Sequence, residues 1–173
     1  MVAGNHLAMK RVKKILITTD FSELSLAAID YASTFELREE VEFSLIHVVD
    51  HVYNVQQQKI THKSERAIRA GEAKASERLK QFVLDHVKLR GNINQIVKTG
   101  KAYAEIVRIA KDDEMDLIII ATHGRTGLAH VFLGSVAEKV VRYSTVPVLT
   151  VKPEAMQELL ISEKDIEEQL HIS

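Results

Sequence analysis

The sequence predicts an α/β protein, a Rossmann-like three-layer sandwich with a five-stranded parallel sheet. Three observations lead to this fold class. Five short runs rich in apolar and β-branched residues recur along the chain, segments with helical periodicity separate them, and the most apolar runs are unbroken rather than alternating. Unbroken apolar strands are typical of a parallel sheet covered on both faces, and parallel strands need crossover connections such as helices.

The five predicted strands differ in polarity. The runs at residues 15–19 and 117–121 are apolar almost throughout, whereas the run at 93–97 is more polar. A strand in the middle of the sheet is buried on both faces, so we expect the polar run at an edge. The other two strands are expected at 43–49 and 146–151.

Four helices are predicted between the strands. The first follows Asp20, with Ser22 available as its N-cap and with apolar residues at three- and four-residue steps from Leu24 to Tyr31. The long second helix is charged and alanine-rich, so we interpret it as a solvated crossover, with a lid over a ligand as the alternative. The last three helices are expected at about residues 61–90, 102–113 and 135–143.

The length of 173 residues fits one domain with a short appendage. We expect the domain to span residues 1–153. The remaining residues, 154–173, carry apolar side chains at helical spacing and are expected to form an amphipathic C-terminal tail. Because short free helices are marginal in water, this tail is expected to dock on the domain or on a dimer partner.

Composition excludes several classes of protein. The formal net charge is −1, so no bulk field attracts the chain to nucleic acid or to an anionic membrane. The absence of cysteine excludes disulfides, thiolate metal sites and cysteine nucleophiles, and it favours a reducing compartment. No run approaches the roughly 18 apolar residues of a membrane span, and residues 1–14 do not resemble a signal peptide. We therefore expect a cytoplasmic protein with no nucleic-acid or membrane partner.

Two strand ends carry residues suited to ligand binding. Open α/β sheets bind ligands beyond the carboxyl ends of their strands, where the strand order reverses. The first strand ends in Thr19 and Asp20, and the fourth runs into a glycine-containing loop that leads to Gly134 and the helix starting at Ser135. Glycines let the backbone approach a phosphate, and a helix N-terminus directs N–H groups at it. Asp20 is suited to accept hydrogen bonds from ribose hydroxyls or to help hold a divalent cation.

Both features also have purely structural explanations. The glycines can serve ordinary turns and helix entry, and Asp20 can cap the helix that follows it. Spacing alone does not decide between these explanations and ligand binding.

Several stretches of the chain resemble the universal stress protein family. Residues 14–23 resemble its opening strand with the aspartate, and residues 47–50 resemble the end of its second strand. The family's ATP signature is a glycine, two residues, a second glycine, nine residues, a third glycine and then serine or threonine. Gly124, nine residues, Gly134 and Ser135 match all but its first position. The resemblance covers about residues 13–152.

This resemblance implies an ATP-binding stress-response or signalling protein that uses ATP with Mg²⁺. Asp20 would meet the ribose, the Val48 backbone would meet adenine, and Gly124, Gly134 and Ser135 would hold the phosphates, so that valine in place of Gly134 would abolish binding. Further residues expected at the site are Thr19, Ala121, His123, Arg125 and Val136. The family commonly pairs through its last strand, so the resemblance also implies a homodimer with protein partners that the sequence does not identify.

Two alternatives remain open, a nucleotide-independent dimeric interaction module of the same fold and a slow ATPase. Arg125 is the only full positive charge between residues 121 and 135, whereas fast phosphoryl transfer needs more charge at the γ-phosphate. We therefore expect no catalytic residues and at most slow hydrolysis. No metal site made of protein ligands is expected. A metal pair four residues apart, such as His47 and His51, needs a helix to bring its two rings together, and His47 lies in a predicted strand.

The chain departs from the family pattern at two positions. Ala121 replaces the first glycine of the signature, and Thr18 stands where the family often has proline. The extra methyl group of Ala121 costs little if the backbone is extended there. It costs about 1 kcal/mol or more if the position requires a positive φ.

Overall fold

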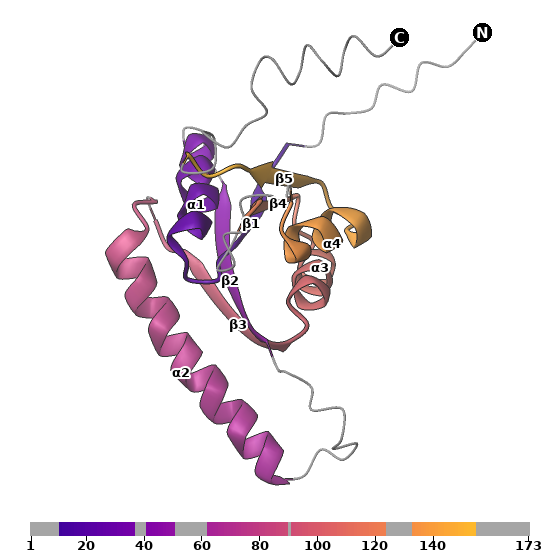
Figure 1. Cartoon of the computed structure of the whole chain (residues 1–173). Helices are drawn as coiled ribbons and strands as arrows, with labels where there is room; N and C mark the ends of the chain where they lie inside the picture. Colours follow the sequence, from indigo (N-terminus) through magenta and orange to yellow (C-terminus); the bar gives the residue numbers. More distant parts are fainter. Residues whose placement is uncertain (1–10, 37–40, 51–61, 90, 124–132, 155–173) are drawn as a thin grey trace, which may run out of the picture.

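The computed structural model describes residues 11–36, 41–50, 62–89, 91–123 and 133–154. These residues form a five-stranded sheet with helices on both of its faces (Figure 1). All neighbouring strands run parallel, in the order β3-β2-β1-β4-β5. The strands are β1 (Lys14–Thr18), β2 (Glu42–Asp50), β3 (Asn94–Gly100), β4 (Leu117–Ala121) and β5 (Val148–Val151). The predicted fold class is therefore confirmed.

The helices divide the core into two layers. Residues of α1 and α2 pack in the hydrophobic cluster on one face of the sheet, and residues of α3 and α4 pack in the cluster on the other face (Figure 1). The helical elements are the 3-10 turn η1 (Glu23–Ser25), α1 (Leu26–Ala32), the 3-10 turn η2 (Ser33–Phe35), α2 (His62–His86), α3 (Ala102–Asp112) and α4 (Ser135–Tyr143).

Alternation along the central strands explains why their sequences are unbroken apolar runs. In β1, Ile15 and Ile17 pack toward α1 and α2, whereas Leu16 packs toward α3 and α4. In β4, Ile119 packs toward α1 and α2, whereas Ile118 packs toward α3 and α4. Because both faces are covered, Ile15 to Ile17 of β1 and all five residues of β4 are apolar and buried.

The two edge strands differ in length and polarity. β3 is one edge, as predicted from its polar sequence, and Asn94 and Gln95 are exposed. The other edge is β5, which is shorter than predicted because it begins after Pro147. Proline has no N–H to donate to a strand ladder, although the Pro147 carbonyl still accepts a hydrogen bond from Ile118 N at 2.9 Å.

The first predicted helix is divided in the structure. Ser22 is the N-cap, and its Oγ accepts a hydrogen bond from Ser25 N at 3.2 Å, as the sequence predicted. The cap starts the 3-10 turn η1, and the α-helical hydrogen-bonding pattern begins only at Leu26. The predicted amphipathic tail lies outside the described residues from 155 onward.

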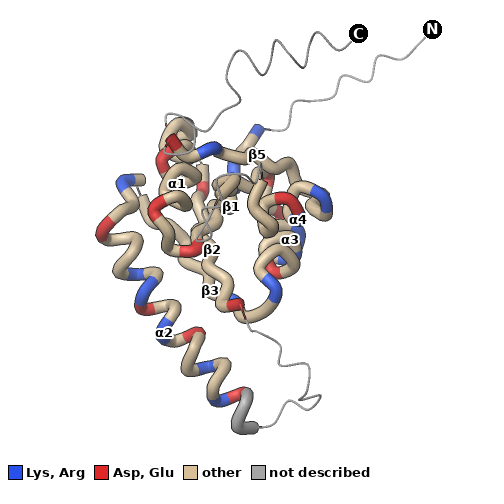
Figure 2. Tube along the Cα trace, in the orientation of Figure 1, with Lys and Arg blue, Asp and Glu red and all other residues tan. Residues whose placement is uncertain are grey.

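The long helix α2 packs on the sheet through a narrow apolar stripe. Ala75, Leu79 and Phe82 are buried, whereas most of its charged residues are exposed. Figure 2 shows basic and acidic residues mixed along its length. No helix among the described residues combines the length and the apolar character needed to cross a membrane.

Candidate functional site

The strand order reverses between β1 and β4. From β1 the chain continues to β2 and β3 on one side, whereas β4 and β5 lie on the other side. The connections at the carboxyl ends of β1 and β4 therefore diverge and leave a crevice. A cavity of about 450 Å³ lies at this point, within the range of small-molecule sites.

The cavity is lined by eight of the ten residues predicted for the site. They come from the ends of β1, β2 and β4 and from the start of α4, which are distant in sequence. These residues are Thr19, Asp20, Val48, Ala121, His123, Gly134, Ser135 and Val136. The other two predicted residues, Gly124 and Arg125, lie outside the described residues.

Sequence reasoning missed several lining residues, in particular Ser25, Ala102 and Ile106. Ser25 enters from η1, and the other two enter from α3. A helix that follows a strand starts at the carboxyl edge of the sheet, so the position of Ala102 directly after β3 was a usable signal. Further lining residues are Thr18, Ile46, His47, Val49, Asp50, Ile120, Thr122 and Ala137.

Most of the large apolar residues of the lining belong to one face of the sheet. Ile46, Ile106 and Ile120 are part of the cluster between the sheet and helices α3 and α4, and Val48 and Val136 pack against that cluster. Helix α2 packs on the opposite face, and none of its described residues lines the cavity. The structure therefore agrees with a solvated crossover for α2 and contradicts its alternative interpretation as a lid over this cavity.

The side chain of Asp20 closes a tight turn with Ser22 at the cavity wall. Its Oδ1 accepts a hydrogen bond from Ser22 N at 3.0 Å and another from Ser22 Oγ at 2.5 Å. Ser22, rather than Asp20, caps η1. The alternative that Asp20 caps the following helix is therefore wrong. Asp20 instead bonds Ser22, and the same residue lines the cavity.

The residues on either side of Asp20 are held by buried hydrogen bonds. Thr19 Oγ1 accepts from Phe21 N at 3.0 Å and lies 2.9 Å from Ser25 Oγ. The Thr19 carbonyl lies 2.9 Å from His47 Nδ1. Since a carbonyl can only accept, Nδ1 of His47 carries the proton.

Gly134 brings the start of α4 against the end of β4. Its N–H donates to the Thr122 carbonyl at 2.6 Å, and a Cβ at position 134 would lie 2.9 Å from that same oxygen. Its φ of −60° is accessible to any residue, so the backbone conformation does not require glycine. The close approach of position 134 to the Thr122 carbonyl does. The first N–H groups of α4, which have no partners within the helix, start at the cavity.

Ala121 lines the cavity at the end of β4. It is the last residue of β4, pairs with Val151, and has no positive φ. It belongs to the core cluster on the α1 and α2 face and also lines the cavity. The replacement of the signature's first glycine is therefore tolerated without backbone strain.

His123 makes a polar contact with its own neighbour in the sequence. Its ring is buried, and Nδ1 lies 2.9 Å from the hydroxyl of its neighbour Thr122. Thr122 N in turn donates to the Val151 carbonyl at 2.8 Å, which ties the end of β4 to β5. His123 thus forms part of a fixed wall.

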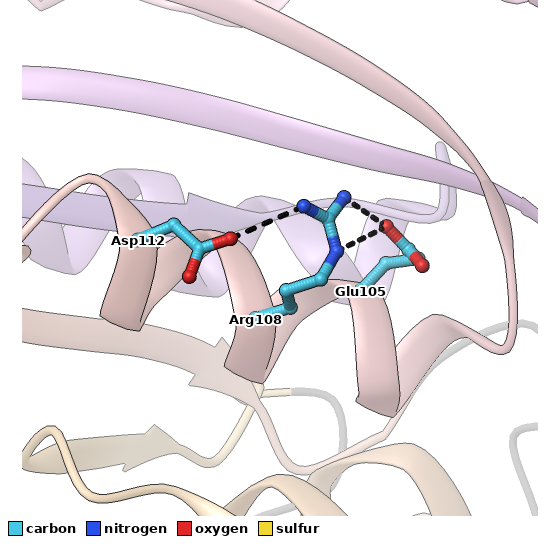
Figure 3. Close-up of polar contacts among 3 residues, drawn as sticks. All are labelled: Glu105, Arg108 and Asp112. Atoms are coloured by element: carbon cyan, nitrogen blue, oxygen red, sulfur yellow. Dashed lines mark hydrogen bonds and ion pairs between the residues drawn. The ribbon is translucent and has the colours of Figure 1, made fainter.

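Three charged residues of α3 form ion pairs outside the cavity. Arg108 donates to Glu105 Oε2 at 2.6 Å and to Asp112 Oδ2 at 3.2 Å (Figure 3). The hydrogen bond and the negative charge of Glu105 raise the pKa of Arg108 above its ordinary value, so Arg108 stays charged. Among the described residues, the cavity lining contains no lysine or arginine, and no group of three or more potential metal-ligating side chains occurs.

Comparison with known proteins gives consistent matches. A model of the universal stress protein family matches residues 11–152. The universal stress protein MJ0577 of Methanocaldococcus jannaschii is 30% identical over 159 residues, which cover 81% of this chain and 94% of that protein. A solved structure of MJ0577, described as a hypothetical protein whose biochemical function was assigned from structure, superposes with a TM-score of 0.70. That alignment has 31% identity and covers 83% of this chain and 97% of the other.

Two further solved structures share the fold at lower identity. One is a universal stress protein family protein from Arabidopsis thaliana with AMP bound, at 19% identity and a TM-score of 0.56, covering 87% of this chain and 97% of that one. The other is a universal stress protein in complex with cAMP, at 22% identity and a TM-score of 0.52, covering 83% and 98%.

Proposed function

Because this chain belongs to the universal stress protein family, we propose that it is an ATP-binding stress-response or signalling protein. The observation that carries the proposal is the cavity between the ends of β1 and β4. It has Asp20 on one side and the N-terminus of α4 on the other. The AMP and cAMP complexes of proteins with the same fold support an adenine nucleotide as the ligand class.

The lining offers a place for each part of a nucleotide. The apolar residues around Ile46 and Ile120 suit a flat base, with the Val48 backbone available for hydrogen bonds to its edge. Asp20 suits the ribose hydroxyls, since an ionised carboxylate accepts two hydrogen bonds from a diol. Gly134, Ser135 and the N-terminus of α4 suit the phosphates.

The proposed protein regulates by occupancy and turns ATP over slowly. Fast phosphoryl transfer requires cationic groups on the γ-phosphate and a residue that places the attacking water. The described lining supplies no lysine or arginine for this purpose. We expect turnover below about 1 s⁻¹, the lower end of typical enzymes. Mg²⁺ would be held mainly by the phosphates and water, because the described lining has too few carboxylates for a dedicated cage.

A second candidate function is a dimeric interaction module that needs no nucleotide. The position of β5 at the sheet edge favours it, because an edge strand presents backbone groups for pairing with a second copy. The leading proposal also includes a homodimer through β5 and a cytoplasmic location, so ATP binding is what separates the two.

Two measurements test the leading proposal. Mass spectrometry of gently purified protein is expected to detect retained ATP or AMP, and calorimetry is expected to give saturable ATP binding. The variant Ala102→Phe should lower the affinity at least about tenfold, because Ala102 lines the cavity and a phenyl ring would fill part of it. Ala104→Phe, on the same helix but exposed and outside the lining, is the control.

The outcomes separate the candidates. Absence of ATP binding at millimolar concentration would reject the nucleotide proposal and favour the interaction module. If Ala102→Phe bound ATP with unchanged affinity, the nucleotide would bind outside this cavity.

A further inference from the structure

Two donors from one residue, Ser22, hold one oxygen of the Asp20 carboxylate. Both the backbone N–H and the hydroxyl of Ser22 donate to the same oxygen, Oδ1, at 3.0 and 2.5 Å. Two donors on one carboxylate oxygen restrict both side-chain torsions of the aspartate. Ser22 therefore restrains the orientation of the carboxylate.

Ser22 is itself fixed by a chain of buried hydroxyl groups. Its carbonyl accepts from Ser25 Oγ at 2.7 Å, and its Oγ accepts from Ser25 N at 3.2 Å. Because the Ser25 hydroxyl donates to that carbonyl, the Thr19 hydroxyl at 2.9 Å must donate to Ser25 Oγ. Ser25 and Thr19 are 4% and 6% exposed, so little water competes for these hydrogen bonds. The network anchors Ser22 to the end of β1.

We propose that Ser22 is a positioning residue that presents the Asp20 carboxylate to the ribose hydroxyls of the bound nucleotide. This inference rests on the proposed function and deepens it. A carboxylate that is already oriented loses less rotational freedom when it accepts two hydrogen bonds from a diol. Discrimination between nucleotides with and without ribose hydroxyls therefore depends on Ser22, which itself contacts no part of the nucleotide in this arrangement.

The test compares ATP with 2′,3′-dideoxy-ATP, which share base and triphosphate and differ only in the ribose hydroxyls. In the native protein ATP is expected to bind about tenfold or more tightly than the dideoxy nucleotide, because hydrogen bonds to a carboxylate are strong. In Ser22→Ala the ratio falls toward one, mainly through weaker binding of ATP. The conservative variant Ser22→Thr keeps a hydroxyl and retains a ratio near the native one.

A second pair of variants separates positioning from helix capping. Ser22→Asp keeps an acceptor for the N-cap hydrogen bond but has no side-chain proton to donate to Asp20, so the ratio falls although the cap remains. General repulsion of the nucleotide by the added charge affects both nucleotides and cancels in the ratio. Ser33→Ala removes an exposed hydroxyl that bonds the Asp30 carbonyl at 2.6 Å, and it leaves the ratio unchanged.

Each failure has its own signature. If Ser22→Ala lowered the affinity for both nucleotides by the same factor, Ser22 would have only a structural role, and the inference would be overturned. A native ratio near one, or a ratio that survives in both Ser22→Ala and Ser22→Asp, would overturn it as well. A native protein that binds neither nucleotide would reject the proposed function itself.

Discussion

Phe21, next to the site aspartate, has a backbone conformation that side chains rarely adopt. Its φ is 65°, in the region that favours glycine. The ring lies 3.9 Å from the His47 ring and 5.4 Å from that of Phe82, measured between centroids, and the Arg78 guanidinium lies 4.4 Å above it. Packing of this ring against β2 and α2 therefore offsets the strain of the turn that carries Asp20.

This balance predicts an unusual order of stabilities for two truncations. Phe21→Ala loses the ring contacts and keeps the strain, which should cost about 2–3 kcal/mol of the free energy of unfolding. Phe21→Gly loses the same contacts but releases the strain, so it should be more stable than the alanine variant by about 1 kcal/mol. Guanidinium unfolding measures both. At a position with a negative φ, the glycine variant would be less stable than the alanine variant. Finding that order here would contradict the positive φ of Phe21.

At the scale of elements, the junction between β4 and α4 depends on Gly134. Sequence reasoning assigned this glycine to the space needed by phosphates. The structure adds an obstacle within the protein, because the first side-chain atom at 134 would already meet the Thr122 carbonyl at 2.9 Å. The variant Gly134→Val would therefore affect the folding of the protein as well as nucleotide binding.

Two glycine-to-alanine variants test this junction. Gly134→Ala should destabilise the protein by about 1–3 kcal/mol, because the β4 end and the α4 start must separate to admit the methyl group. Gly71→Ala is the matched control in α2, where no atom lies within 4 Å of an added Cβ, and it should stabilise by about 0.5–1 kcal/mol. Thermal unfolding distinguishes them, and equal effects of the two variants would contradict the close approach at Gly134.

At the scale of the whole molecule, β5 leaves one side of its backbone without a neighbouring strand in the described sheet. Ile118 N and Thr122 N of the β4 side donate to the carbonyls of Pro147 and Val151. In a parallel ladder alternate residues face the partner, so Val148 and Thr150 direct their backbone groups away from β4. These groups are the ones available for pairing with a second copy.

We expect a homodimer that Thr150→Pro dissociates. Proline removes the outward N–H of Thr150 without removing a donor to β4, so the fold should persist while the dimer weakens. Light scattering at micromolar concentration measures the mass, circular dichroism checks the fold, and Thr150→Val is the control that keeps the N–H. A native monomer, or a folded Thr150→Pro dimer, would refute pairing through β5.

The sequence by itself determined the five strands, the covered faces of the sheet and the polar edge strand. These properties follow from local patterns, because a strand covered on both faces carries consecutive apolar residues, as Ile15 to Ile17 of β1 and all of β4 do. It also indicated both sides of the cavity, since the ends of parallel strands meet at one edge. The sequence did not predict that the first helix would divide into η1 and α1. The choice between 3-10 and α-helical hydrogen bonds after Ser22 depends on small differences in free energy.

Only the tertiary structure decided what individual side chains do at the site. The methyl group of Ala121 causes no backbone strain because position 121 is the paired end of β4 and has no positive φ, although the residue lines the cavity. Ser25 and Ala102 line the cavity only because β1 and β3 bring the following helices to one edge. The hydrogen bonds from Ser22 to Asp20 likewise depend on a turn that packing of Phe21 on α2 maintains. Such roles depend on contacts between residues distant in the chain, which local periodicity does not encode.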